Sequence, residues 1–220
     1  MERTSHYLTE SSTPRGSQEH ALAIEGLVCS GKSTLCSSLA ATYSLSLVKE
    51  YMDFLPAEHP AGKQVLPADQ RVALFTSLEA SRLKSIPRNT NTILDRSFLS
   101  LIAFEYAIAN TGQPSSLATY LDSSHLFLVP TQTFFLDVSA SEQTYRAKRR
   151  GTSVLPLLLS SSFNAAVREF FGKLAVLCPD SVQFVAADTT IQVPMFVNEC
   201  LRRRPIGPNC LLAALREAAL

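Results

Sequence analysis

Two glycines, a lysine and a serine stand at fixed spacing in the segment GLVCSGKS, residues 26–33. Glycines tolerate backbone angles that other residues resist, so the backbone N–H groups between them can curl around a phosphate at the start of a helix. The pattern G-x-x-x-x-G-K-[ST] assigns Lys32 to the β and γ phosphates of a nucleoside triphosphate and Ser33 to Mg²⁺. Thr34 would bond a phosphate oxygen nearer the nucleoside. The predicted phosphate-binding residues are Gly26, Leu27, Val28, Cys29, Ser30, Gly31, Lys32, Ser33 and Thr34.

Carboxylates and arginines further along the chain could act on such a phosphate. Glu50 can take the proton of a hydroxyl acceptor, although a solvated charge at a strand end is the alternative. Asp95 can hold a Mg²⁺-bound water, and Arg96 can orient the acceptor oxygen or a phosphate; a purely structural pair is the alternative. Arg146 and Arg150 are four residues apart and share a helix face, so both could stabilise a transferring phosphoryl group. The predicted catalytic residues are Lys32, Glu50, Asp95, Arg96, Arg146 and Arg150, and the predicted metal ligands are Ser33 and Asp95.

Alternating strands and helices would bring these residues together. Apolar segments predict strands over residues 21–26, 46–51, 91–97, 131–139 and 182–188. Helical spacing follows the first four of them, over residues 32–44, 68–85, 98–109 and 139–151, and we expect a further helix after the fifth strand. This order predicts an α/β three-layer fold with a five-stranded parallel sheet covered by helices on both faces. Ligands of such sheets bind beyond the carboxyl ends of the strands, where the candidate residues lie.

The chain divides into a short tail and one domain. Residues 1–20 are polar and predict a disordered N-terminal tail, and residues 21–220 predict a single domain. Ser139 and Glu142 have the spacing of a helix capping box, and Gly151 would end that helix, which predicts a lid segment near residues 140–152. The serine-rich stretches at 115–124 and 160–162 are predicted as loops or caps.

Composition limits the partners and the compartment. A formal net charge of +1 over 220 residues gives no general electrostatic reason to bind nucleic acid or a membrane surface. No apolar run reaches membrane-spanning length. The five cysteines show no metal-ligand spacing, which favours reduced thiols, no structural metal and a cytoplasmic location.

Several segments, in order, resemble the family of P-loop deoxynucleoside kinases and the related thymidylate kinases. IEGLVCSGKST is similar to their first strand and phosphate loop, and KEY to the strand end that carries their acceptor-side glutamate. SRLK, DRSFLS and YRAKRRG are similar to a helix segment, a signature after the third strand and an arginine lid. The resemblance implies a kinase domain that uses ATP and Mg²⁺. It also implies that Asp188, with Thr189, borders the adenine site.

The acceptor side departs from this family. Phe75 stands where the base-reading glutamine of the deoxynucleoside kinases falls, and Leu101 where its aspartate partner falls. The segment ALF also resembles the thymidylate-kinase segment whose phenylalanine stacks on thymine, but Glu79 replaces the arginine expected there. Thr152 replaces a lid arginine, and no proline follows Glu50. The predicted substrate-binding residues are Tyr51, Phe75, Arg82 and Arg96, with core packing as the alternative for the two aromatic side chains.

We therefore expect an ATP-dependent phosphotransferase that acts on the 5′-hydroxyl of a (deoxy)nucleoside. Three alternatives stay open: a kinase of nucleoside monophosphates such as thymidylate, a kinase of a non-nucleoside small molecule, and a P-loop NTPase that works as a switch or accessory subunit. The expected partner is a small-molecule acceptor, and a homodimer is compatible with the sequence.

Overall fold

A five-stranded parallel sheet forms the centre of the computed structural model, which describes residues 21–56, 58–87, 90–151, 154–189 and 208–219. The predicted tail, residues 1–20, and Thr152 lie outside these ranges. The strand order is β2-β3-β1-β4-β5, and every pairing is parallel. The strands are β1 (Ala21–Gly26), β2 (Ser46–Val48), β3 (Thr92–Asp95), β4 (Gln132–Asp137) and β5 (Val182–Ala186).

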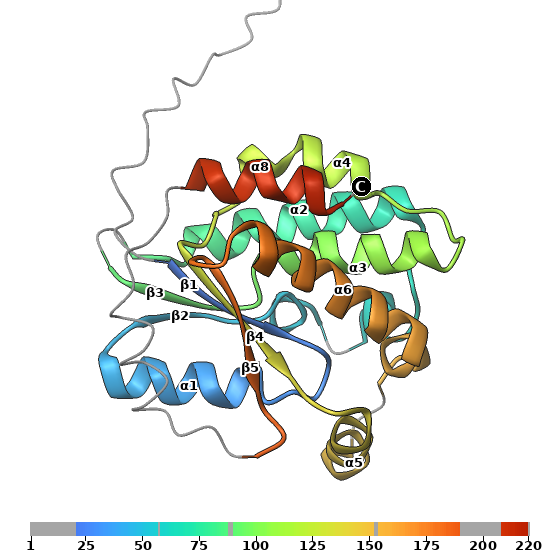
Figure 1. Ribbon diagram of the computed structural model, residues 1–220, viewed down its shortest axis with the longest axis horizontal. Coiled ribbons are helices and arrows are strands. Elements are labelled where there is room, and N and C mark those ends of the chain that lie inside the picture. The colour runs from blue at the N-terminus through green and yellow to red at the C-terminus, as the bar shows by residue number, and fades with distance from the viewer. Residues whose placement is uncertain (1–20, 57, 88–89, 152–153, 190–207, 220) are drawn as a thin grey trace, which may run out of the picture.

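Helices cover both faces of the sheet, which confirms the predicted three-layer fold. In the described residues they are α1 (Lys32–Tyr43), α2 (Ala68–Lys84), α3 (Phe98–Asn110), α4 (Leu117–Asp122), α5 (Ala140–Arg150), α6 (Ser161–Leu177) and α8 (Pro208–Ala218), with 3₁₀ helices at Tyr51–Phe54, Pro60–Gly62, Ser124–Leu126 and Pro156–Leu159. Figure 1 shows α1 on one face and α2, α3 and α6 on the other, with α4 and α8 packed further out. The α5 helix lies beyond the carboxyl end of β4. No helix within the described ranges is long and apolar enough to cross a membrane.

The alternation of side chains along β4 explains the two layers. Phe134 packs with Leu35 and Leu39 of α1, whereas Phe135 packs with α3 and α6 on the opposite face. Successive side chains of a strand point to opposite faces, so consecutive buried phenylalanines require a helix on each side. The rings of Phe135 and Phe171 of α6 lie tilted against each other, with their centroids 4.7 Å apart.

Two local predictions differ from the structure, and one helix was not predicted. The strand predicted over residues 46–51 ends at Val48, and Glu50 precedes a 3₁₀ helix instead of lying in the sheet. The stretch predicted as loop or cap at 115–124 contains α4. Ser160 does cap a helix, since its Oγ accepts from the N–H of Phe163 at 3.4 Å, but the helix that follows, α6, runs for 17 residues without having been predicted. The described cysteines, Cys29, Cys36, Cys178 and Cys210, are free thiols.

Candidate active site

The loop between β1 and α1 has the backbone that the glycine spacing predicts. Gly26 and Gly31 have φ angles of +143° and +96°, in the region that side chains disfavour. A Cβ at position 26 would lie 2.7 Å from the carbonyl oxygen of Leu136, so β4 approaches too closely for any other residue. Cys29 also has a positive φ, 62°. Residues 26–31 therefore form a tight turn that leads directly into the N-terminus of α1, where an anion is favoured.

Lys32 lies across this loop. Its Nζ donates to the carbonyl oxygen of Leu27 at 2.9 Å, and the residue is only 5% exposed. Burial, with the nearby positive charge of Arg96, lowers the pKa of Lys32 to about 8. A lysine that retains its charge at neutral pH in so buried a position is strongly attracted to an added anion, because little water screens it.

Ser33 and Asp95 present oxygen atoms at the start of α1 and the end of β3. Burial raises the pKa of Asp95 above its ordinary value, although the hydroxyl of Ser33 acts in the opposite direction. The Oδ1 atom of Asp95 is buried without a hydrogen-bond partner, which is costly unless a cation or ligand completes it. Hydroxyl and carboxylate oxygens suit Mg²⁺, and the described residues hold no cluster of three or more metal-ligating side chains, so most ligands of such an ion would be phosphate oxygens and water.

Glu50 and Arg96 meet in front of the loop. Arg96 Nε donates to Glu50 Oε1 at 2.6 Å, and Arg96 Nη1 donates to the carbonyl oxygen of Gly26 and to Ser100 Oγ, both at 3.0 Å. Burial alone would raise the pKa of Glu50, but the charges of Arg96 and Lys32 outweigh it and leave that pKa below its ordinary value. Glu50 is therefore a carboxylate at neutral pH, although most of its surroundings are protein.

A second carboxylate, which the sequence analysis did not select, is linked to Arg96 through the hydroxyl of Ser100. Glu25 is fully buried in β1 and accepts hydrogen bonds at 2.7 Å from both the N–H and the hydroxyl of Ser97, and another from Ser100 Oγ. Burial raises the pKa of Glu25, against the hydrogen bonds and the charge of Arg96. The signal in the sequence was a charged residue inside an otherwise apolar strand, directly before the glycine loop.

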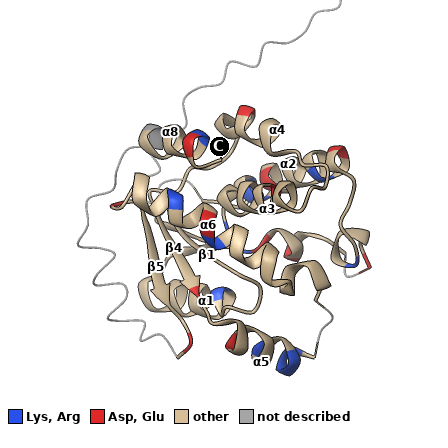
Figure 2. Cartoon of the chain, turned by 45° about the vertical axis from the view of Figure 1, so that its right-hand side comes forward, with Lys and Arg blue, Asp and Glu red and all other residues tan. Residues whose placement is uncertain are grey.

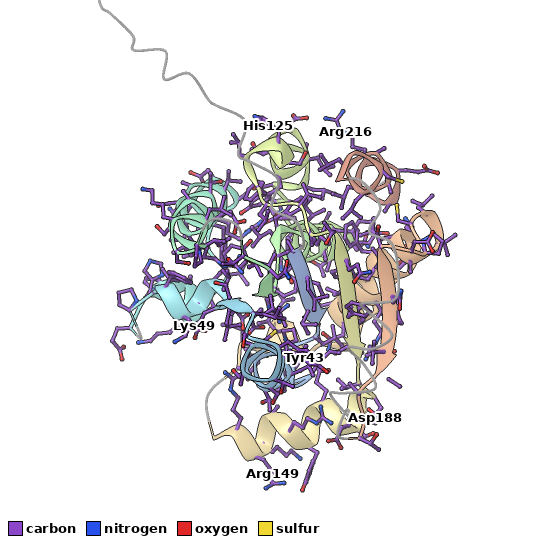
Figure 3. All side chains as sticks on the ribbon, turned by 90° about the vertical axis from the view of Figure 1, so that its left-hand side faces the viewer. Tyr43, Lys49, His125, Arg149, Asp188 and Arg216 are labelled. Atoms are coloured by element: carbon purple, nitrogen blue, oxygen red, sulfur yellow. The ribbon has the colours of Figure 1, made fainter. Side chains whose placement is uncertain are left out.

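Arg146 docks α5, the predicted lid segment, on the glycine loop. Its Nη1 donates to the carbonyl oxygen of Ser30 at 3.0 Å, and its Nη2 donates to that of Ala187 at 2.7 Å. Asp188 Oδ1 accepts the N–H of Ser139 at 2.7 Å, so this carboxylate holds the start of α5. Figure 3 shows Asp188 beside that end of the helix. Arg150 is exposed at the other end, which Figure 2 shows as the basic end, and its charge still lowers the pKa of Glu50.

A cavity of about 710 Å³ connects the glycine loop with an apolar pocket between α2, α3 and α6. Lys32, Glu50, Arg96, Arg146 and Arg150 line its charged end. The pocket is lined by Tyr51, Phe75, Leu101 and Phe104, and the ring centroids of Tyr51 and Phe75 lie 5.7 Å apart, edge to face. Beyond them, Arg71 donates to Glu105 through Nε at 2.6 Å and Nη2 at 2.8 Å. This buried pair is the polar floor of the pocket.

One predicted residue points away from the cavity. Arg82 was predicted to bind the acceptor, but it is 1% exposed, does not line the cavity and directs its guanidinium to the backbone behind Glu50 and Arg96. Asp188 accepts the N–H of Ser139, and its place at the border of an adenine site stays a prediction. The predicted catalytic residues other than Asp95 line the cavity.

Comparison with solved structures identifies the fold. A deoxyadenosine kinase from M. mycoides with bound dCTP superposes with a TM-score of 0.63 at 20% identity, over 81% of this chain and 97% of that chain. A thymidylate kinase from Candida albicans gives 0.56 at 21% identity, over 83% and 89%. No protein-family model and no curated protein sequence matches the chain. At this level of identity the likeness concerns the fold, which is that of the P-loop kinases.

Proposed function

We propose that the chain is a kinase that transfers the γ-phosphoryl group of ATP, with Mg²⁺, to the 5′-hydroxyl of a (deoxy)nucleoside. The observation that carries the proposal is the position of Glu50. Its ionised carboxylate is hydrogen-bonded to Arg96. It lines the cavity that Lys32 also lines and that contains the apolar pocket. The structural likeness to a deoxyadenosine kinase supports this reading of the pocket.

The residues of the site divide the reaction among them. The N–H groups of residues 26–34 and Lys32 bind the phosphates, and Glu50 accepts the hydroxyl proton as the acceptor oxygen bonds to the γ-phosphorus. The bond between that phosphorus and the oxygen that bridges to the β-phosphate breaks, and ADP leaves. Arg150 stabilises the charge on the transferring group, and Arg146 holds α5 against the glycine loop. Mg²⁺, held by Ser33 and through water by Asp95, would neutralise phosphate charge.

The charges on the acceptor side favour a neutral nucleoside over a monophosphate. A phosphate acceptor needs cations of its own, but Arg96 is already bonded to Glu50 and to the carbonyl oxygen of Gly26. Arg71, at the far end of the pocket, is bonded to Glu105. A monophosphate acceptor is also anionic and needs no base, so it would leave Glu50 without a role. The cytoplasmic location and the homodimer stay predictions from the sequence.

An acceptor screen tests the proposal. ADP formation is measured for the full chain with Mg²⁺ and ATP across a panel of nucleosides, nucleoside monophosphates and unrelated hydroxyl compounds, with Lys32→Ala as the inactive control. We expect phosphorylation of at least one nucleoside and a loss of several orders of magnitude in the control. Faster reaction with a monophosphate would show a thymidylate-like kinase, and faster reaction with an unrelated compound a small-molecule kinase. ATP hydrolysis independent of any acceptor would show a switch or accessory NTPase.

A further inference from the structure

Arg82 joins the chain after β2, which leads to Glu50, to the chain at the end of β3, which leads to Arg96. Its Nε donates to the carbonyl oxygen of Lys49 at 2.9 Å, which belongs to the peptide bond that leads into Glu50. Its Nη2 donates to the carbonyl oxygen of Arg96 at 2.6 Å and to that of Asp95 at 3.3 Å. One guanidinium thus holds the peptide groups on both sides of Arg96 and the one before Glu50.

The remaining contacts of Arg82 fix the guanidinium itself. Nη1 donates to Glu79 Oε2 at 2.8 Å, one turn earlier on α2, and both side chains are buried. The guanidinium carbon lies 3.9 Å from the centroid of the Tyr51 ring, a cation–π distance. Five N–H donors in a planar fork suit this arrangement, and a lysine could not reproduce it.

The backbone at Arg96 needs such support. Its φ angle is +65°, a left-handed conformation that costs free energy for any residue with a Cβ. On one side the N–H of Arg96 donates to the carbonyl oxygen of Ile24 at 3.1 Å, and on the other side Arg82 binds its carbonyl oxygen. Both contacts hold the turn that aims the side chain of Arg96 at Glu50.

We propose that Arg82 is a positioning residue that sets the geometry of the Glu50–Arg96 pair from behind the cavity wall, and does not bind the acceptor. The proposal rests on the proposed function, because it assigns the pair to catalysis. Loss of Arg82 would let the Arg96 turn relax, and the guanidinium of Arg96 would move away from Glu50. A displacement of this size in a reacting group typically lowers turnover more than it weakens binding of the donor.

The same displacement would change the protonation of Glu50, because burial raises the pKa of this carboxyl and the cations that face it lower it. Without close contact to Arg96, the pKa of Glu50 would rise. As the pH is lowered, turnover would therefore begin to fall at a higher pH than in the wild type. The charged groups that face Glu50 are Lys32 on α1, Asp95 at the end of β3, Arg96 directly after it, and Arg150 on α5.

The test compares Arg82→Gln and Arg82→Lys with Leu78→Ala in the full chain. Leu78 is buried on the same helix and lies outside the cavity, so its truncation destabilises the core without touching the strand ends. We expect Arg82→Gln to lower kcat about tenfold or more with little change in KM for ATP, and Arg82→Lys to recover part of the loss. Leu78→Ala should lower thermal stability and leave the pH profile unchanged.

A measurement that needs no acceptor separates this proposal from the proposed function. The Glu50 carboxyl carbon is assigned by NMR against a Glu50→Gln spectrum and titrated in each variant. A higher Glu50 pKa in the Arg82 variants, with no change in Leu78→Ala, supports positioning even if the acceptor screen fails. An unchanged Glu50 titration in folded Arg82→Gln would overturn it. If Arg82→Gln does not fold, the Glu50 titration is measured in Arg82→Lys. A raised Glu50 pKa in that variant supports the proposal, and an unchanged one overturns it.

Discussion

At the scale of single residues, the charged groups of the site set one another's protonation. Burial lowers the pKa of Lys32 to about 8, which still leaves most of it protonated at neutral pH. Arg96 and Lys32 hold Glu50 ionised in spite of its own burial. The two residues therefore stand in the forms that the proposed reaction needs: a cation for the phosphates and a carboxylate for the hydroxyl proton.

Replacing Glu50 tests the second of these roles. Glu50→Gln keeps the shape of the side chain but cannot take a proton, so kcat at saturating ATP and nucleoside should fall by about 10²-fold. ATP affinity, measured by calorimetry, should change little. Because Arg96 and Lys32 hold the pKa of Glu50 below its ordinary value, the wild type should keep its base ionised at a lower pH than an ordinary glutamate would.

The control for this replacement is Glu58→Gln. Glu58 is exposed, pairs with Lys63 and lies outside the cavity, so its loss should leave kcat unchanged. If Glu50→Gln turned over its best acceptor as fast as the wild type, Glu50 would not be the base, and a monophosphate acceptor would become the better hypothesis.

The sequence predicts site residues that belong to a local motif. It does not predict residues whose role depends on contacts with distant parts of the chain. Gly26, Lys32 and Ser33 followed from spacing alone, because the loop is local in the chain. Glu25 and Arg82 were missed or assigned to another role. Their functions come from partners 72 and 33 residues away along the chain, Ser97 and Lys49, which no local pattern encodes.

At the scale of elements, α5 is held at one end and open at the other. Ser139 caps it, with its Oγ accepting the N–H of Glu142 at 3.3 Å, and Asp188 accepts the N–H of Ser139. Arg146 bonds to the backbone of the glycine loop. Arg150, near the C-terminus, faces the cavity with no hydrogen bond or ion pair to the described residues. The helix therefore carries one arginine that docks it and one that is available for the transferring group.

The two arginines should differ when each is replaced by alanine. Arg150→Ala should lower kcat by about tenfold or more with little effect on ATP affinity or thermal stability, since it removes charge stabilisation alone. Arg146→Ala should also weaken ATP binding, because it frees α5 from the glycine loop. The measurements are steady-state kinetics, calorimetry with ATP and thermal unfolding.

Arg149→Ala is the matched control for this pair. Arg149 lies on the outer side of α5, and it bonds only to Tyr145 among the described residues. Its replacement should leave all three quantities unchanged. An effect of Arg150→Ala on ATP affinity alone would mean that this arginine holds the donor and does not act on the transferring group.

Helices and strands were predictable where the apolar pattern extends over many residues. The strands β1 and β4 and the helices α1, α2, α3 and α5 were predicted close to their observed bounds, because burial on both faces or on a helical stripe leaves a clear apolar pattern. β2 ended earlier than predicted, since pairing with β3 stops at Val48. α6 was not predicted, although its buried positions Phe163, Val167, Phe170 and Leu174 have helical spacing.

At the scale of the whole molecule, many of the buried charged groups lie at the carboxyl end of the sheet. Glu25, Lys32, Arg82, Asp95 and Arg96 are each at most 5% exposed, and Arg71 and Glu105 form a second buried pair in the pocket. Burying charged groups costs stability even when they are paired. The site therefore lowers the free energy of unfolding in exchange for function, and the cost of Lys32 depends on pH in a way that can be measured.

Lys32→Met should make the protein without nucleotide more stable at neutral pH while abolishing phosphoryl transfer. The pKa of Lys32 is about 8 in the folded chain and 10.5 as its ordinary value, so between these pH values the unfolded state binds more protons than the folded state. Burial of Lys32 therefore costs no stability above pH 10.5, where the side chain is neutral in both states. The cost grows as the pH falls and is complete below about pH 8. Below that pH the methionine variant should gain on the order of 1–3 kcal/mol. The gain, measured by chemical denaturation, should shrink as the pH rises above 8. Other titrating groups are common to both proteins and cancel in the difference.

Lys49→Met, at an exposed lysine (Figure 3), is the control and should show no such pH-dependent gain. An equal gain in both variants would show that added apolar surface, and not relief of a buried charge, stabilises the chain.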